Sequence, residues 1–423
     1  MFPRLIFHAN FAESPDDSQV FFVAALSKVL NSNATQSGSP KIGASFGCFL
    51  ATRFELENGS RVSASQNPFF LAAGARDPFD IEKPKKVAAL PAQFPSQTSL
   101  ERVIDLSMNG GAPLGDDDIV VILGHGNGST ISALTDEISK FTIAINDRAV
   151  ASRTRSWARN WFASLLSLQA KANGLDTTAI ANGLGANKPG LIILHSCFAG
   201  TLEFAYGLRA SGKHLLASPA NLLVRDIGYG KWLDNKYANK PVPKIADSAR
   251  YLVDLVRSGG GELALLALYD LSKFEALKTS LKSFLDAAKF AVAQDTVGKP
   301  ELVSAMNSCY KFDLPDTALK AIDLHQFGQF AGGIPVLATD AKNLCDAAQA
   351  CVVARSNDGN GIRSGSGFPN EVIGLSIILP KEAYLPDALH LESIEWDAEI
   401  LKMNFPVAFS TGWLSFLRNG GAG

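Results

Sequence analysis

The sequence predicts an α/β fold with a mostly parallel central sheet and helices on both faces. Two apolar runs are the first observation. Residues 119–126 read IVVILGHG and residues 191–200 read LIILHSCFAG, and each is typical of a buried strand that breaks at glycine. The second observation is the long interval between the runs, which has room for the helical crossover that joins parallel neighbours. The third is composition, since 47% of the residues are hydrophobic and 19% are charged, which suits a large buried core.

The N-terminal part is expected to contribute strands to this fold. Residues 5–7 read as a first strand, and the apolar positions of residues 20–30 have helical spacing. The interval that follows is rich in β-formers, and its Asn58-Gly59 dipeptide is the strongest short signal for a hairpin. The expected elements are strand-like runs at residues 46–54, 61–64 and 69–72, a proline-rich loop at 78–95 and a helix at 99–108.

The rest of the chain alternates helices and strands at first and is less regular later. Between the two apolar runs, the spacing of Trp157, Trp161, Phe162, Leu165 and Leu168 predicts a crossover helix that ends near Gly174. The further elements are a helix after Cys197 that ends at Gly212, strands at 214–218 and 262–269, an amphipathic helix at 271–293, strands at 351–355 and 372–379 around a glycine-rich loop at 357–367, and helical parts from residue 391 around Trp396 and Trp413.

Charge and cysteine usage exclude several classes of partner. The formal net charge is −2, and no Lys/Arg cluster is interleaved with aromatic residues, so we expect no nucleic-acid partner. No apolar run reaches the length of about 18 residues that indicates a membrane span. The five cysteines form no CxxC pair, which argues against a disulfide scaffold and a zinc site. Residues 1–8 lack the features of a secretory signal, so the expected location is the cytoplasm.

His125 and Cys197 follow the two apolar runs and are the candidate catalytic residues. The carboxyl ends of neighbouring parallel strands meet at one edge of a sheet, where a histidine and a cysteine form a base and a nucleophile. Cys197 also precedes a predicted helix, whose N-terminus is expected to favour the thiolate. His125 is the expected general base and later the acid for the leaving amine. The N–H groups of Gly126 and Cys197 are the expected oxyanion hole, and the pattern indicates a cysteine peptidase with a peptide or protein substrate.

These two motifs resemble the catalytic dyad of the caspase-like cysteine peptidases, a group that includes caspases, metacaspases, legumains, gingipains and clostripain. Within that group the chain is most similar to the clostripain family, because further blocks match in order. The resemblance implies a caspase-like three-layer sandwich and endopeptidase action through a Cys197 thioester. The matching blocks are residues 204–206, 215–218, 268–273, 321–324 and 374–380.

The domain organisation is inferred from the sequence pattern, and the resemblance names its catalytic core. No repeat or linker divides the chain, so one large domain is expected. Residues 1–258 are assigned to a caspase-like catalytic core with an N-terminal β-rich extension, and residues 259–423 to a C-terminal part that continues the domain.

The predicted substrate pocket departs from the family pattern. The residue two positions before the cysteine commonly lines the pocket for the side chain before the cut bond, and clostripain-like enzymes have Asp there, which suits Arg or Lys. This chain has His195, which supplies no fixed negative charge. Asp226 is the candidate for a second pocket acid that would keep a basic preference; without it, His195 favours an acidic or polar side chain. Ser196 and Ser218 complete the predicted substrate-binding set.

The resemblance also bears on how the protein matures and on whether it needs a cofactor. Such peptidases often cleave themselves between the histidine and cysteine strands, an interval that holds Lys140, Arg148, Arg153 and Arg155 as candidate sites. The chemistry needs no metal or cofactor. Calcium dependence occurs in the group, and no dense carboxylate loop in this sequence decides whether it applies here. An activating partner is equally open.

Two alternatives compete with the peptidase. Residues 124–130, GHGNGST, follow a strand and offer backbone N–H groups to a phosphate, as in a nucleotide- or phosphate-binding α/β module, although they match neither GxGxxG nor GxxxxGK[ST]. The other alternative is a catalytically inactive caspase-like scaffold that keeps the fold for partner binding.

Overall fold

The computed structural model describes the central sheet and most of the surrounding helices. The described residues are 4–11, 43–50, 54–55, 61–62, 69–72, 100–101, 104, 112–126, 131–132, 175–220, 222, 227–236, 243–258, 265–297, 299–312, 319–357, 368–369 and 371–380.

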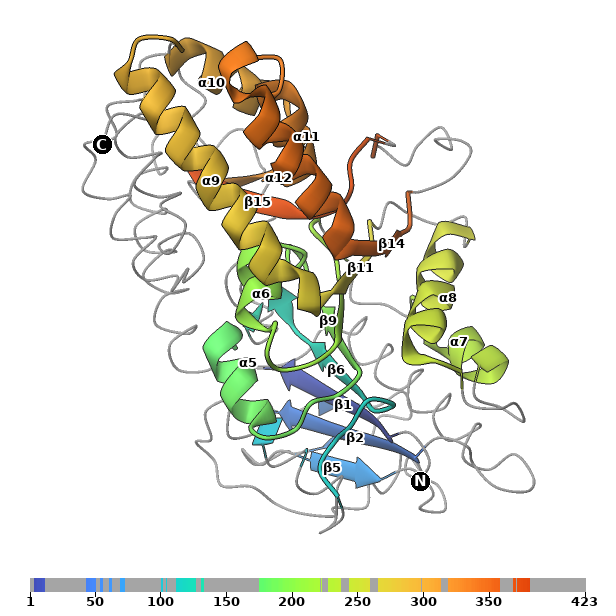
Figure 1. The fold of residues 1–423 in the computed structure, drawn as a ribbon. Helices are drawn as coiled ribbons and strands as arrows, with labels where there is room; N and C mark the ends of the chain where they lie inside the picture. The colour runs from blue at the N-terminus through green and yellow to red at the C-terminus, as the bar shows by residue number, and fades with distance from the viewer. Residues whose placement is uncertain are drawn as a thin grey trace, which may run out of the picture.

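Within these residues the central sheet has eight strands, in the order β14-β11-β10-β9-β6-β1-β2-β5 (Figure 1). Its middle five strands, from β10 to β2, are parallel neighbours, whereas β5 and β11 pair antiparallel with their neighbours inside the sheet and β14 pairs antiparallel with β11. The predicted mostly parallel sheet is therefore confirmed. The strands are β1 (Arg4–Phe11), β2 (Gly43–Leu50), β5 (Phe69–Ala72), β6 (Ile119–Leu123), β9 (Leu191–His195), β10 (His214–Ala217), β11 (Ala267–Asp270) and β14 (Val352–Arg355).

The two apolar runs become β6 and β9, which lie side by side in parallel register from Ile119↔Leu191 to Leu123↔His195. Every residue of both strands is buried, as expected for strands that are covered on both faces. Side chains alternate between the faces, so Ile192 and Leu194 join the main hydrophobic cluster and His195 points to the opposite face.

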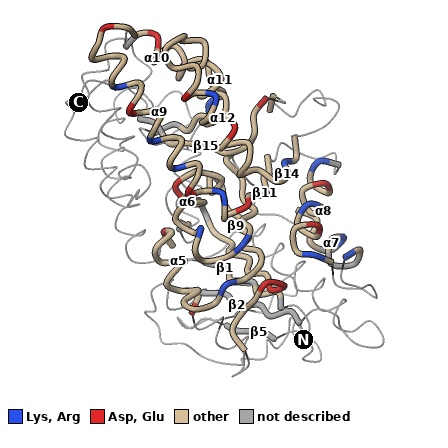
Figure 2. The backbone as a smooth tube through the Cα atoms, in the orientation of Figure 1, with Lys and Arg blue, Asp and Glu red and all other residues tan. Residues whose placement is uncertain are grey.

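Helices cover both faces of the sheet and complete the three-layer sandwich (Figure 1). One face carries α5 (Thr177–Leu184), α6 (Leu202–Gly207) and the long α9 (Phe274–Ala293), and the other carries α7 (Tyr229–Lys236) and α8 (Ile245–Ser258). Figure 2 shows charged residues along α8 and α9, whereas the sequences of β6 and β9 contain no Asp, Glu, Lys or Arg. Charged residues therefore lie on these outer helices, and the two central strands carry none.

The C-terminal part adds a helical layer and a small antiparallel sheet. Phe284 of α9 meets the ring of Phe327 edge-on at 5.4 Å between ring centroids, which packs α9 against the helix that carries Phe327. The small sheet has the order β12-β13-β15. The elements are the short 3₁₀ turns η1 (Leu271–Lys273) and η2 (Pro335–Leu337), α10 (Lys299–Ser308), α11 (Leu324–Ala331), α12 (Ala338–Cys351), β12 (Lys311–Phe312), β13 (Leu319–Asp323) and β15 (Ser376–Pro380).

Most of the expected elements that fall on described residues are present. The Asn58-Gly59 hairpin is confirmed by the antiparallel pair β3 (Phe54–Glu55) and β4 (Arg61–Val62), and the helix at 271–293 by η1 and α9. Two boundaries differ: the strand predicted at 372–379 begins only at Ser376, after Gly374 takes a φ of 83°, and the helix after Cys197 ends at Gly207. The elements expected at 20–30, 78–95 and 157–168, most of the 357–367 loop and the helical parts after 391 lie outside the described residues.

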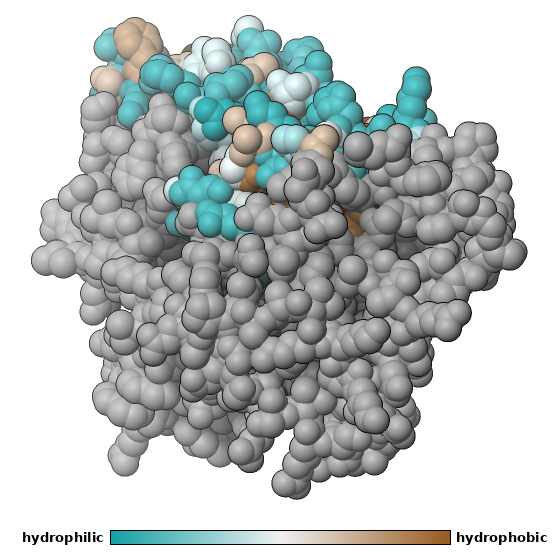
Figure 3. All heavy atoms as spheres, turned by 90° about the horizontal axis from the view of Figure 1, so that it is seen from below, coloured by the Kyte–Doolittle hydropathy of each residue, from teal (hydrophilic) through white to brown (hydrophobic). Residues whose placement is uncertain are grey.

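The surface of the described part is mixed. Figure 3 shows one face, on which the described residues are mostly hydrophilic. Among the large hydrophobic residues that the structure describes, Phe290, Phe330 and Val336 are exposed. None of the described helices is long and apolar enough to cross a membrane.

Glu203 of α6 is a buried carboxyl that faces β15. Its Oε1 accepts a hydrogen bond from the backbone N–H of Ile378 in β15 at 3.5 Å, and its Oε2 has no hydrogen-bond partner within the described structure. Burial raises the pKa of Glu203 from 4.5 to about 7, against the smaller effect of backbone hydrogen bonds. The fold therefore favours the protonated carboxyl, and that stability is lost as pH rises through the folded-state pKa.

We expect the pH dependence of stability to change in Glu203→Gln. Relative to this variant, the free energy of unfolding of the wild-type protein should fall between about pH 4.5 and about pH 7, by on the order of 3 kcal/mol, and stay level above. Asp323, whose pKa burial also raises to about 7, is present in both proteins and cancels in the comparison. Urea unfolding across this pH range measures the difference, and parallel profiles would contradict the assignment.

Candidate active site

The candidate nucleophile lies in a tight turn between β9 and α6. The turn runs from Ser196 to Gly200, and Thr201 then caps α6 by accepting a hydrogen bond from the N–H of Phe204 at 3.2 Å. Phe198 is buried and has a φ of 52°, in the left-handed region that side chains rarely adopt. Such a conformation costs about 1–3 kcal/mol and persists only where the surroundings fix it.

Backbone groups after β10 hold this turn on one side. We call residues 218–220 and 222 the strap. The N–H of Phe198 donates to the carbonyl of Ala220 at 3.0 Å, and the N–H of Gly200 donates to that of Ser218 at 2.7 Å. The hydroxyl of Ser218, which we predicted to bind substrate, is used inside the strap: it donates to the carbonyl of Ala220 at 3.0 Å and accepts from its N–H at 3.1 Å.

The thiol of Cys197 also contacts the strap. Its Sγ donates to the carbonyl oxygen of Leu222 at 3.3 Å and accepts from the N–H of the same residue at 3.2 Å. Burial raises the pKa of the Cys197 thiol, although these backbone hydrogen bonds partly oppose the rise. The expected lowering of the Cys197 pKa by a helix N-terminus is therefore not found: α6 begins only at Leu202, and burial raises the pKa of the thiol.

The His125 segment lies directly against the nucleophile turn. Beyond the end of β6, the N–H of Gly124 donates to the carbonyl of His195 at 3.4 Å, and β7 (His125–Gly126) follows. A Cβ atom on Gly126 would overlap the carbonyl oxygen of Cys197 and the Oγ of Ser196. The backbones of Gly126 and Cys197 are therefore in contact, and the residue at this position must be glycine. The His125 side chain lies outside the described residues.

The residues on both sides of the loop considered for phosphate binding pair with each other. His125 and Gly126 pair antiparallel with β8 (Ile131–Ser132), while residues 127–130 lie outside the described residues. Phosphate-binding loops of nucleotide-binding α/β folds instead open into a helix, whose N-terminus supports the anion. The structure does not provide that support at residues 131–132, which disfavours this alternative.

His195 points to the face of the sheet covered by α7. Its Nδ1 lies 3.1 Å from the hydroxyl of Tyr229, and both side chains are buried. Tyr229 in turn packs on Trp232, whose indole N–H donates to the backbone carbonyl and the hydroxyl of Ser248, both at 2.9 Å. No sequence pattern indicates the partner Tyr229, because it lies 34 positions away on another element. Asp226, the predicted second pocket acid, lies outside the described residues.

One further motif carries the spacing of a serine nucleophile. Residues 43–47 read GASFG, which fits G-x-S-x-G, a pattern that marks a strand-to-helix elbow in α/β-hydrolases. Here all five residues belong to β2, and Ser45 pairs with Ile6 on one side and Ala72 on the other. The serine lies within the sheet and not at an elbow, so this match has no catalytic geometry. Among the residues described, no group of three or more His, Cys, Asp or Glu side chains could hold a metal ion.

The fold is shared with solved cysteine proteases. Neither protein-family models nor curated proteins match the sequence. Among solved structures, a secreted C11 cysteine protease from Bacteroides thetaiotaomicron in complex with an irreversible peptide inhibitor is 12% identical, with a TM-score of 0.56 over 98% of this chain and 99% of that one. An inactive zymogen C11 protease from Parabacteroides distasonis is 15% identical, with a TM-score of 0.51 over 94% and 98%. The chain therefore has the caspase-like fold of the C11, or clostripain-like, cysteine proteases.

The contact between Gly126 and Cys197 predicts a large effect for Gly126→Ala. The new methyl group would meet backbone atoms, which cannot rotate away, so we expect a loss of about 2 kcal/mol in the free energy of unfolding. Gly115→Ala is the matched control, because a Cβ there would meet nothing within 4 Å. Urea unfolding of both variants measures the difference; equal stabilities would show that the two backbones are not in contact.

Proposed function

We propose that the protein is a cysteine endopeptidase in which Cys197 is the nucleophile and His125 the general base and acid. The observation that carries the proposal is the contact of the His125–Gly126 backbone with the Cys197 turn, at the carboxyl ends of two neighbouring parallel strands. The shared fold of the C11 cysteine proteases supports it.

The reaction would use these residues in two steps. His125 takes the thiol proton while the Cys197 sulfur attacks the carbonyl carbon of the substrate, and the N–H groups of Gly126 and Cys197 receive the oxyanion. The C–N bond then breaks as His125 protonates the leaving amine, which leaves a thioester. Water attacks the thioester with proton transfer through His125, and the released carboxyl product restores the thiol.

The resting state of the thiol fits a nucleophile that is activated late. Burial raises the pKa of the Cys197 thiol, and the thiol both donates to and accepts from the backbone of Leu222. Cys197 therefore rests as a neutral thiol. The base must therefore act as the substrate enters, since the thiolate is the reactive form. The same observation is what an inactive scaffold would present, and only an activity measurement separates the two.

Substitution of either dyad residue is expected to abolish cleavage. Cys197→Ala and His125→Ala should each lower the rate of hydrolysis of a fluorogenic peptide library by at least about 10³-fold, because nucleophile and base act as a unit. Cys345→Ala is the control, since its thiol lies elsewhere, on α12, and donates to the carbonyl of His325. Its activity should equal that of the wild-type protein.

Cleavage that survives Cys197→Ala would show that another group is the nucleophile. A wild-type protein that cleaves no peptide, or a Cys197 that a peptidyl electrophile labels no faster than Cys345, would favour the inactive scaffold. The same Cys197→Ala protein tests self-processing between His125 and Cys197: a cut wild-type chain and an intact variant on a denaturing gel would support it. Calcium dependence, an activating partner and a cytoplasmic location remain proposals that rest on the sequence alone.

We further propose that the residue before the cut bond is acidic or polar. The support is His195, which is buried, faces α7 and is hydrogen-bonded to Tyr229, so that this position offers a polar pair without the fixed negative charge that would suit Lys or Arg.

Profiling with a peptide library tests this preference. We expect weak cleavage after Lys and Arg in the wild-type protein, and a gain of about tenfold or more for basic residues in His195→Asp, since a buried carboxylate discriminates strongly by charge. Asp226→Asn is the second variant. A wild-type preference for basic residues that disappears in Asp226→Asn would show that Asp226, and not His195, sets the specificity.

A further inference from the structure

The nucleophile turn is anchored on its second side by segments that lie far along the chain. The carbonyl oxygen of Gly200 accepts hydrogen bonds from the backbone N–H of Ser376 at 3.1 Å and from its hydroxyl at 3.3 Å. The hydroxyl of Tyr269 in β11 lies 3.4 Å from the same oxygen. Thr201 and Ser376 also form an isolated parallel bridge. The end of the turn is therefore attached to β11 and β15.

Tyr269 joins these anchors to one another. Its hydroxyl donates to the carbonyl of Gly374 at 2.5 Å, and its ring is fully buried edge-on against Phe274 at 6.2 Å between centroids. Gly374 is itself fixed, because its N–H donates to the carboxylate of Asp323, the residue that caps α11, at 3.1 Å. The hydroxyl thus bridges a rigid point of the C-terminal part and the turn that carries Cys197.

The space around Gly200 leaves the turn little freedom. A Cβ atom there would lie 2.5 Å from the nitrogen of Pro219 in the strap and 2.6 Å from the hydroxyl oxygen of Tyr269. The backbone of Gly200 is therefore packed between the strap and Tyr269. Burial, with the charge of Asp323, raises the pKa of Tyr269 well above its ordinary value, so the hydroxyl stays a donor.

We propose that Tyr269 is a positioning residue for Cys197. The Tyr269 hydroxyl is held by the carbonyl of Gly374 and packs against Gly200, and so keeps the turn in the conformation that Phe198 requires. This inference rests on the proposed function. The strap holds the N–H groups of the turn, and Tyr269 with Ser376 holds its last carbonyl. With the hydroxyl removed, the carbonyl of Gly374 loses its buried donor and Gly200 loses the oxygen that packs against it, so the turn is free to relax away from the conformation of Phe198.

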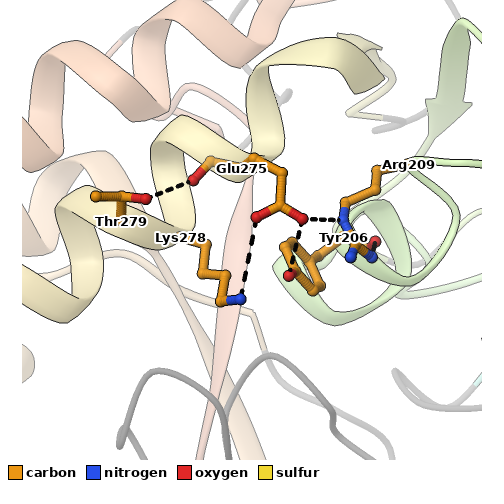
Figure 4. A network of polar contacts seen from close by, with 5 residues as sticks. All are labelled: Tyr206, Arg209, Glu275, Lys278 and Thr279. Carbon is orange, nitrogen blue, oxygen red and sulfur yellow. Dashed lines mark hydrogen bonds and ion pairs between the residues drawn. The ribbon is translucent and has the colours of Figure 1, made fainter.

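Tyr206 provides a matched control for the loss of a tyrosine hydroxyl. It lies on α6, directly after the turn, but its hydroxyl donates to Glu275 on α9 at 3.1 Å (Figure 4). Glu275 also accepts from Arg209 at 2.6 Å, and Lys278 lies 4.0 Å from its other oxygen. The Tyr206 hydroxyl therefore stabilises the contact between two helices without reaching the nucleophile turn.

The experiment compares Tyr269→Phe with Tyr206→Phe in the full chain. For peptide hydrolysis we expect Tyr269→Phe to lower kcat by about tenfold or more with KM nearly unchanged, because a misplaced nucleophile slows the chemical step and leaves substrate binding intact. Tyr206→Phe should change neither constant. In parallel, mass spectrometry measures the rate at which iodoacetamide alkylates each cysteine. Cys197 should react severalfold faster in Tyr269→Phe, since the relaxed turn releases the thiol from Leu222.

The buried thiols of Cys309 and Cys351 report whether the variant is folded. If they become reactive as well, Ser376→Ala replaces Tyr269→Phe, because it removes the other side-chain donor to Gly200, and the same selective change at Cys197 is expected. Unchanged kcat and unchanged Cys197 alkylation in the folded variant overturn the proposal, as does an equal loss of kcat in Tyr206→Phe. If the wild-type protein cleaves no peptide, the proposed function fails, while the alkylation comparison still decides whether Tyr269 positions the thiol.

Discussion

The in-register parallel pairing of β6 with β9 is the constraint on which the site depends. Leu123 and His195 are partners at the last position of the pairing, so the two strands end at the same level of the sheet. The residues that follow each strand are then brought together: Gly126 after β6 and Cys197 after β9. A shift of one residue in this register would turn every side chain of one strand to the opposite face. The apolar core and the placement of the candidate dyad are therefore set by the same pairing.

This dependence explains how much the sequence could predict. β6 and β9 are buried on both faces, so each appears as a continuous apolar run, and the Asn58-Gly59 hairpin carries its signal in two adjacent residues. Tyr229, Leu222 and Tyr269 have no such signal. Each acts through contacts with residues far away in sequence, and no local pattern of residue types indicates those contacts.

The one prediction about chemistry that the structure reverses, the lowered pKa of Cys197, shows which physical effect dominates. A helix dipole at an exposed N-terminus contributes about 0.3–1 kcal/mol and fades within the first turn. Here the six-residue α6 begins beyond Thr201, while the thiol is covered by the strap. Desolvation raises the pKa of the half-buried thiol, and α6 is short and begins beyond it, so the expected lowering is not found. The order of the elements in the sequence indicates the helix after Cys197 but not the strap that covers its thiol.

The anchoring of the nucleophile turn makes the C-terminal part of the chain a component of the site. Residues 374–378 contact the turn and the start of α6 through Gly200, Thr201 and Glu203. The strap comes from the segment after β10, so the turn lies between two segments that join the chain at different times during synthesis. A strained residue such as Phe198 is stable only when both are in place. It follows that the nucleophile acquires its geometry from the complete fold, and that the strand on which it sits is necessary for the site but not sufficient.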